Sequence, residues 1–112
     1  MPRYKMIALT RPQPGRDDEF NEWYQNVHLV ELCTMPGVTG AQRYKLAAPL
    51  QGYDERPYLA VYDIECDDIR QTLGAIGAAS ASGQMTPCDA ADSANSYTVV
   101  FEEFGERVVA KA

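Results

Sequence analysis

The sequence predicts an α+β fold in one domain spanning residues 1–112, with its elements in the order β-α-β-β-α-β. Three observations predict it. Four short segments combine apolar or β-branched residues with flanking turn formers, as strands do. Two longer segments begin with acidic residues, and the first also repeats its apolar residues at helical spacing. The chain of 112 residues has the length of a single domain.

The first strand and first helix are marked by breakers on either side. YKMIALT at 4–10 is short and apolar and runs into the breaker-rich RPQPG. A helix is expected at 16–35, with Asp17 as N-cap and acidic residues in the first turn, where they favour the positive end of the helix dipole. Pro36 ends it, because proline disfavours helical geometry at the preceding residue. Its apolar positions are Phe20, Trp23, Tyr24, Val27 and Val30.

The remaining elements include one strand with apolar residues on both faces. YLAVYDIE at 58–65 has this pattern in its first half, which is typical of a central strand covered on both sides. The second helix begins with two aspartates but contains Gly74 and Gly77, each costing about 1 kcal/mol relative to alanine. The other segments are a strand at 38–47, a turn at 48–57, the helix itself at 67–82, a loop at 83–95 and a last strand at 96–104.

This order of elements predicts a ferredoxin-like fold, an antiparallel four-stranded sheet with two helices on one face. Two helices cover only one face, yet the strand at 58–65 has large apolar side chains in both phases. A bare apolar sheet face indicates an interface, and a second copy of the chain is its simplest cover. We therefore expect a homodimer. One phase presents Tyr58, Ala60, Tyr62 and Ile64, and the other presents Leu59 and Val61.

Composition excludes several classes of protein. The net charge of −6 and the lack of a Lys/Arg cluster argue against nucleic acid as a partner. No apolar run approaches the roughly 18 residues of a membrane span. The N-terminal residues contain no convincing signal peptide, which favours the cytoplasm. The sequence also lacks GxSxG, GxGxxG and P-loop motifs, which argues against a serine hydrolase or a nucleotide-binding protein.

Cysteine spacing argues against a metal site. Cys33, Cys66 and Cys88 form no CxxC pair, and an odd number does not suit a disulfide framework. A zinc site made from them and His28 would need convergence from distant parts of the chain. We expect reduced thiols and no metal.

The only histidine, His28, lies at the edge of the apolar arc of the first helix, one turn beyond Tyr24. Glu31 follows three residues later, so the two side chains can meet. A buried carboxylate there would raise the pKa of the imidazole and set its tautomer, as suits a general acid or base near neutral pH. The alternative is a histidine that hydrogen-bonds the backbone, with Glu31 solvated on the last turn.

Aromatic and basic residues supply the other candidates. Trp23 and Tyr24 fit core packing, and Tyr24 could also present its hydroxyl to a ligand. Arg43 could hold a carboxylate or be a solvated or interface residue. Asp63 and Glu65 fit a solvent-facing strand end. Three strand tyrosines could line a mostly apolar pocket, or pack between subunits; these are Tyr44, Tyr62 and Tyr97.

Three stretches carry a resemblance to a known family. FNEWYQNVHLVEL, MPGVTGAQRYKL and PYLAVYDIE resemble the EthD-like group of the dimeric α/β-barrel superfamily. The resemblance implies that two chains pair face to face, their sheets closing around a small-molecule cavity that His28 borders. It also implies roles in breakdown or cyclisation of small, often aromatic or polyketide-like compounds, in many cases with no metal or organic cofactor.

Together these features give a functional hypothesis. The chain is expected to be a cofactor-independent enzyme that performs proton-transfer chemistry on a small hydrophobic or aromatic compound, as an isomerase, cyclase, dehydratase or decarboxylase. The alternatives are a non-catalytic small-molecule binding protein and a haem-binding monooxygenase. His28 is the expected acid or base and Tyr24 its catalytic partner; the expected substrate-binding residues are Trp23, Glu31, Arg43, Tyr44, Tyr62 and Tyr97.

Overall fold

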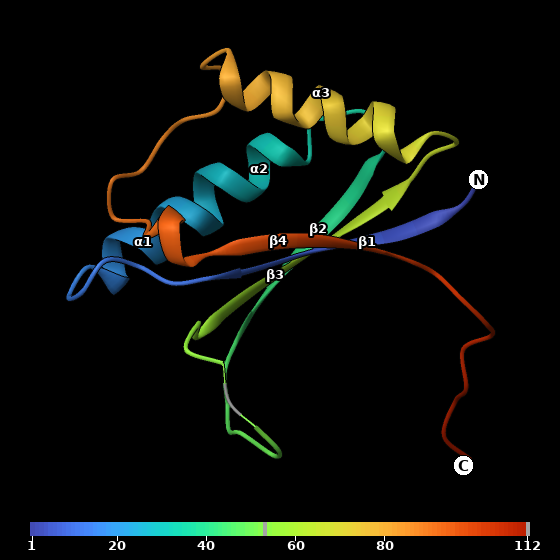
Figure 1. The fold of residues 1–112 in the computed structure, drawn as a ribbon, viewed down its shortest axis with the longest axis horizontal. Coiled ribbons are helices and arrows are strands. Elements are labelled where there is room, and N and C mark those ends of the chain that lie inside the picture. Colours follow the sequence, from blue (N-terminus) through green and yellow to red (C-terminus); the bar gives the residue numbers. More distant parts are fainter. Residues whose placement is uncertain (53, 112) are drawn as a thin grey trace.

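A computed structural model describes residues 1–52 and 54–111 of the chain, and residues 53 and 112 lie outside this description. Helices cover one side of a twisted sheet (Figure 1). The strands are β1 (Arg3–Thr10), β2 (Val38–Lys45), β3 (Tyr58–Glu65) and β4 (Tyr97–Glu102). The helical segments are α1 (Asp17–Trp23), the π-helix η1 (Tyr24–His28), α2 (Leu29–Leu32), α3 (Ile69–Ala81) and the 3-10 turn η2 (Ser93–Asn95).

The sheet has the strand order β2-β3-β1-β4, and each neighbouring pair is antiparallel. This confirms the predicted α+β, ferredoxin-like architecture. β3 coincides with the predicted strand at 58–65 and is one of the two central strands. The other strand boundaries differ from the prediction by one or two residues. β2 and β4 end earlier than predicted, because apolar residues such as Leu46 and Phe104 follow the last ladder pairs without joining the sheet.

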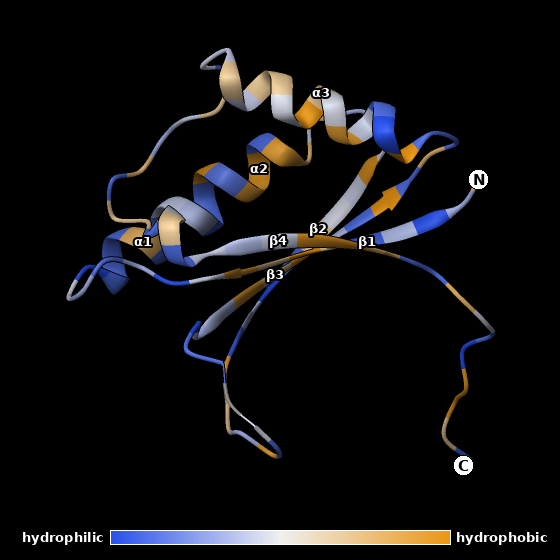
Figure 2. Ribbon diagram, in the orientation of Figure 1, coloured by the Kyte–Doolittle hydropathy of each residue, from blue (hydrophilic) through white to orange (hydrophobic). Residues whose placement is uncertain are grey.

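The two faces of the sheet have different environments. Side chains alternate across a strand, so Met6, Ala60 and Tyr62 face the helices and are buried. Within the described residues, the other face has no helix over it, and residues 46–52, 54–57 and 103–111 extend on that side (Figure 1). The strands of the sheet are apolar along much of their length (Figure 2). On the open face, Ile7, Leu9, Leu59 and Val61 are half-buried, and Val99 and Phe101 are exposed.

The predicted helix at 16–35 is interrupted. It consists of α1, the five-residue π-helix η1 and α2, and it ends at Leu32. A π-turn bonds residue i to i+5 and so inserts one residue into the helical repeat. The prediction that Val30 lies on the apolar face was therefore wrong: Val30 is 58% exposed. The residues that the helix buries are Phe20, Tyr24, Leu29 and Leu32.

The helix ends also differ from the expectation. Arg16, and not Asp17, occupies the N-cap position of α1, and no side chain caps this end. Asp17 lies inside the helix, and its carboxylate accepts a hydrogen bond from the Tyr58 hydroxyl (2.9 Å), which ties α1 to β3. At the start of α3, the Asp68 carboxylate accepts from the backbone N–H groups of residues 70 and 71, as an N-cap should.

The long connection from α3 to β4 is anchored at Asp92, a buried carboxylate. Its Oδ2 accepts hydrogen bonds from Asn95 Nδ2 (2.8 Å) and from Arg11 Nε (3.0 Å). These bonds hold the pKa of Asp92 below its ordinary value. The anchor fixes the far end of the 83–92 segment, which lies against α1 and α2 (Figure 1).

Substitution of two adjacent residues tests the π-turn. Leu29→Ala should lower the free energy of unfolding by about 2–5 kcal/mol, because it leaves a cavity in the core. Val30→Ala, at an exposed position, should change it by no more than about 0.5 kcal/mol. Chemical denaturation of both variants gives the comparison. The opposite order would mean that the helix continues in regular α-helical phase.

Candidate functional site

A cavity of about 240 Å³ lies between the helices and the covered face of the sheet, within one chain. The expectation that His28 borders a cavity between the sheets of two chains is therefore wrong, because His28 lies on the covered side and two sheets would meet on the open side. The cavity volume is slightly below the roughly 300–1,000 Å³ of pockets for drug-sized ligands, so it suits a small molecule. The lining is mostly apolar, with hydroxyl groups and one imidazole. Its residues are Met6, Ala8, Tyr24, His28, Leu32, Tyr62, Ile76, Ser80, Met85 and Thr98.

His28 occupies the last position of the π-helix and is half-buried. Its ring stacks on Trp23, with centroids 4.6 Å apart and planes at 22°, and meets Tyr24 edge-on at 4.8 Å. The extra residue of the π-turn allows this contact between residues five apart. Nδ1 of His28 is buried and has no hydrogen-bond partner among the described residues.

Burial lowers the pKa of His28, and the opposing charge of Glu31 is the weaker influence. Glu31 raises the pKa of His28, as expected, but burial has the larger effect, so the net shift of the pKa is downward. The reason is that the Glu31 carboxylate is not buried beside the ring. It accepts hydrogen bonds from the Thr86 backbone N–H (2.9 Å) and hydroxyl (2.8 Å), which lower its own pKa. His28 is consequently uncharged at neutral pH.

Thr86 lies in the loop after α3 and connects this loop to α1 and α2 through hydrogen bonds. Besides its two bonds to Glu31, its carbonyl accepts a hydrogen bond from Trp23 Nε1 (3.0 Å). The neighbouring residue, Met85, lines the cavity. Trp23 and Glu31, expected to bind substrate, are not lining residues; instead they hold the loop that brings Met85 to the cavity.

Tyr24 and Tyr62 lie together at the cavity. Both are buried, and the Tyr62 hydroxyl donates to the Tyr24 hydroxyl across 3.1 Å. Burial raises the pKa of each phenol. Both hydroxyls therefore stay protonated and act through hydrogen bonds.

Arg43 points to the covered side of the sheet but does not line the cavity. Its guanidinium lies 4.6 Å from the centroid of the Tyr24 ring, and its Nη2 donates to Asn21 Oδ1 (2.9 Å). Burial lowers the pKa of Arg43. A cation over an aromatic face is a favourable contact. In the structure Arg43 therefore contacts the Tyr24 ring, and not a carboxylate as the sequence had suggested.

The other two strand tyrosines lie on the open face, so the three do not share a pocket. Tyr44 is opposite Leu59 in the ladder and borders a separate hollow of about 170 Å³. The Tyr97 ring contacts the Arg56 guanidinium, 4.6 Å from its centroid. The strand register determines which face of the sheet each tyrosine lies on, because a shift of one residue moves every side chain of a strand to the opposite face.

The sequence reasoning missed several lining residues. Ser80 and Thr98 add hydroxyls to the cavity, and Ile76 and Met85 add apolar wall. The sequence feature that could have predicted the cavity is the presence of small residues on its walls. Ala8 lies opposite Thr98 in the ladder, and α3 is rich in alanine and glycine. Small side chains at facing positions leave space that larger ones would fill.

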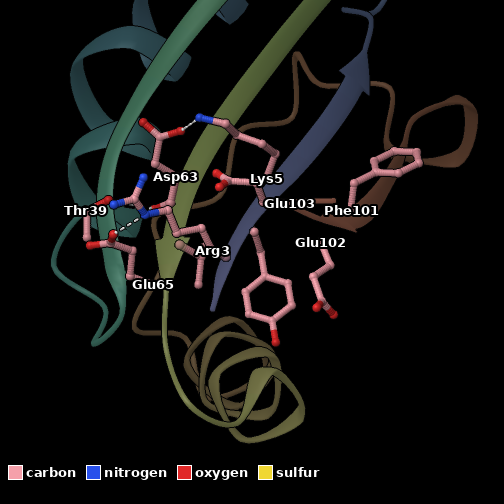
Figure 3. Close-up of a pocket in the computed structure, with 10 residues that line it drawn as sticks. Arg3, Lys5, Thr39, Asp63, Glu65, Phe101, Glu102 and Glu103 are labelled. Atoms are coloured by element: carbon pink, nitrogen blue, oxygen red, sulfur yellow. Dashed lines mark hydrogen bonds and ion pairs between the residues drawn. The ribbon is translucent and has the colours of Figure 1, made fainter. Parts of the chain in front are cut away.

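A second hollow, of about 330 Å³, lies at the sheet end where β1 begins and β4 ends (Figure 3). Four of its charged side chains form ion pairs, Lys5 with Asp63 and Arg3 Nε with Glu65 at 3.0 Å, while Glu102 and Glu103 also line it. Exposed pairs of this kind contribute only ~0–1 kcal/mol each. Within residues 1–52 and 54–111, no three His, Cys, Asp or Glu side chains are grouped to hold a metal ion.

Comparison with known proteins relates the fold to two solved structures. No family model and no curated protein matches the sequence. An EthD family protein from Bacillus halodurans superposes with a TM-score of 0.62 at 15% identity, covering 91% of this chain and 99% of that one. HapK from Hahella chejuensis gives 0.51 at 19% identity, over 99% and 100% of the two chains.

The chain shares the α+β, ferredoxin-like fold of these two structures. Both solved structures belong to the dimeric α/β-barrel fold group, in agreement with the resemblance found in the sequence. At these identities the likeness concerns the fold alone. In the part of the chain that the structure describes, no helix combines the length and the hydropathy needed to cross a bilayer.

The lowered pKa of His28 predicts how stability depends on pH. The unfolded chain, whose histidine titrates near 6.5, binds a proton before the folded chain does. Stability should therefore fall as the pH drops below this value and recover above it. Unfolding free energies of the wild type and of His28→Gln, measured from about pH 7.5 to 5.5, should diverge towards acid, with the wild type losing more. An NMR titration of the single histidine showing a pKa above 6.5 would contradict this.

Proposed function

We propose that the chain is a cofactor-independent enzyme that transfers protons on a small hydrophobic compound bound in the His28 cavity. One observation carries the proposal: the only imidazole of the chain borders a mostly apolar cavity, beside a pair of hydrogen-bonded tyrosine hydroxyls. Acid–base chemistry needs a titratable group within hydrogen-bond reach of its substrate, in a place that excludes bulk water.

Three polar residues of the cavity have proposed roles. His28 is the acid or base, and its lowered pKa keeps it uncharged near pH 7. Tyr24 orients and polarises a substrate oxygen, and Tyr62 supports Tyr24 by donating to it. The apolar wall, with Leu32 and Ile76, takes the hydrophobic part of the substrate. The reaction class is isomerisation, cyclisation, dehydration or decarboxylation.

The second candidate function is binding without catalysis. It is favoured by the absence of a carboxylate or backbone acceptor on Nδ1 of His28 among the described residues. Histidines that act as general bases commonly have such a partner, which orients the ring and stabilises its charged form. A binding protein needs no such support.

We also propose that two copies pair through the open sheet face, in the cytoplasm. The exposed apolar residues of β4 and the fold group, whose members are typically dimeric, support the pairing. Residues 46–52, 54–57 and 103–111 extend on the open side (Figure 1), where a partner chain would contact them. Three free thiols suit a reducing compartment.

Hydrogen–deuterium exchange tests the catalytic proposal without knowledge of the natural substrate. The wild type should accelerate deuterium incorporation next to the carbonyl of a neutral bicyclic ketone such as 2-tetralone, followed by NMR in D₂O. His28→Gln should lower the enzyme-catalysed rate by about 10²–10⁴-fold, the usual contribution of an acid–base group. Glu22→Gln, an exposed change on the preceding turn, should leave it unaltered.

Two results would contradict the catalytic proposal. Equal rates for the wild type and His28→Gln would remove the histidine from the mechanism. Binding of the ketone by the wild type with no acceleration over buffer would favour the binding protein.

Sedimentation or light scattering across a concentration series tests the dimer. The wild type should be dimeric at micromolar concentration, and Phe101→Glu should shift it towards monomer, because a charge would be buried in an apolar interface. Val30→Glu is the matched control, since both positions are 58% exposed and Val30 lies on the helical side. A stable wild-type monomer, or equal dissociation by both variants, would contradict pairing through this face.

A further inference from the structure

The cavity carries no charged side chain. Among its described lining residues there is no lysine, arginine, aspartate or glutamate. Arg43 supplies a nearby cation, but it lies outside the lining, with its guanidinium over the Tyr24 ring and bonded to Asn21. A carboxylate or phosphate entering the cavity would lose its hydration without gaining an opposite charge, which is costly.

The surroundings of His28 decide which ring nitrogen carries the proton. Nδ1 is buried with no partner among the described residues, and Glu31, the neighbouring carboxylate, is bonded to Thr86. Either tautomer leaves Nδ1 unpaired, but a buried N–H without an acceptor is rarer in folded proteins than an acceptor without a donor. Nε2 is not among the enclosed unpartnered atoms. The neutral ring therefore carries its proton on Nε2, where it can be donated.

Tyr24 supplies a second donor beside the first. Its oxygen already accepts the Tyr62 hydroxyl at 3.1 Å, and its own proton has no acceptor within the described residues. Its ring meets His28 edge-on at 4.8 Å, so both groups belong to one wall of the cavity. The Arg43 guanidinium over the Tyr24 ring draws electron density from the phenol and strengthens it as a donor.

We propose that His28 Nε2–H and the Tyr24 hydroxyl together bind an uncharged oxygen acceptor, the carbonyl of a flat hydrophobic ketone or quinone, and that the cavity rejects carboxylates. This inference rests on the proposed use of the cavity as the ligand site. It replaces the acid-or-base role of His28 with that of a hydrogen-bond donor: Nε2–H polarises the ligand carbonyl and stabilises the enolate, while a solvent base takes the proton. It also defines the substrate class by two hydrogen-bond donors without a neighbouring cation in the lining.

Three probes of nearly equal shape test the selectivity. 2-Acetylnaphthalene offers a neutral carbonyl, 2-naphthoate a carboxylate, and 2-ethylnaphthalene no oxygen. At neutral pH the ketone should bind the wild-type protein at least about tenfold more tightly than either of the others, measured by NMR titration or calorimetry. Equal or tighter binding of 2-naphthoate or 2-ethylnaphthalene would overturn the inference, as would no binding of the ketone up to millimolar concentration.

Variants and the histidine tautomer locate the effect. Tyr24→Phe should lower the affinity for the ketone severalfold and leave that for 2-ethylnaphthalene unchanged. Tyr4→Phe is the matched control, because Tyr4 is buried on the same sheet face but does not line the cavity, and it should keep the full preference. Long-range ¹H–¹⁵N correlation on the single histidine should show the Nε2–H tautomer. An Nδ1–H tautomer, or an equal loss in both variants, would overturn the proposal.

These results are separable from the catalytic proposal. If the probes show the expected selectivity but no deuterium exchange is accelerated, the result supports binding by the two donors and contradicts the catalytic proposal. If exchange depends on His28 but the carboxylate binds as well as the ketone, the result supports the catalytic proposal and contradicts the proposed ligand class.

Discussion

One irregular turn, the π-helix at Tyr24–His28, sets the relation between the helix, the core and the cavity. It inserts one residue between two stretches of regular helix, so the face that begins with Phe20 continues at Leu29 and Leu32 and not at Val30. The same turn stacks His28 on Trp23. π-turns cost regular hydrogen bonding and are found frequently at functional sites. Here the π-turn directs Leu29 and Leu32 into the core and leaves the His28 ring at the cavity.

The sheet separates two surfaces with different properties. On the covered side, Tyr62 is among the most buried side chains, and its hydroxyl has a partner in Tyr24. On the open side, the charged groups at the strand ends pair across the ladder, and the centre is apolar. A single sheet thus carries a ligand-sized cavity on one face and a surface suited to association on the other. Pairing through the open face would leave the cavity of each chain intact.

Electrostatics give the cavity its chemical character. The lining is uncharged, since burial lowers the pKa of His28 and raises those of Tyr24 and Tyr62. The neighbouring charges are engaged elsewhere: Glu31 with Thr86, and Arg43 with Asn21. Neutral donors in a largely apolar enclosure favour uncharged ligands that carry a hydrogen-bond acceptor. The bonds of Trp23 and Glu31 to Thr86 hold the loop after α3 in place, and neither residue lines the cavity.

Sequence reasoning recovered the fold because it depends on local signals. Strand alternation, breakers such as Pro36 and acidic helix starts act within a few residues, and β3 was predicted to the residue. The helix phase beyond Tyr24 was missed, because a uniform repeat of 100° per residue contains no π-turn.

What the sequence by itself determined is the order of the elements, the two apolar faces of the central strand and the singularity of His28. Only the tertiary structure decided that Tyr62 joins His28 while Tyr44 and Tyr97 do not. It also decided that Glu31 bonds Thr86, 55 residues away. The physical reason is that register and long-range contacts depend on how distant segments pack, and a one-residue shift in a strand reverses every side chain.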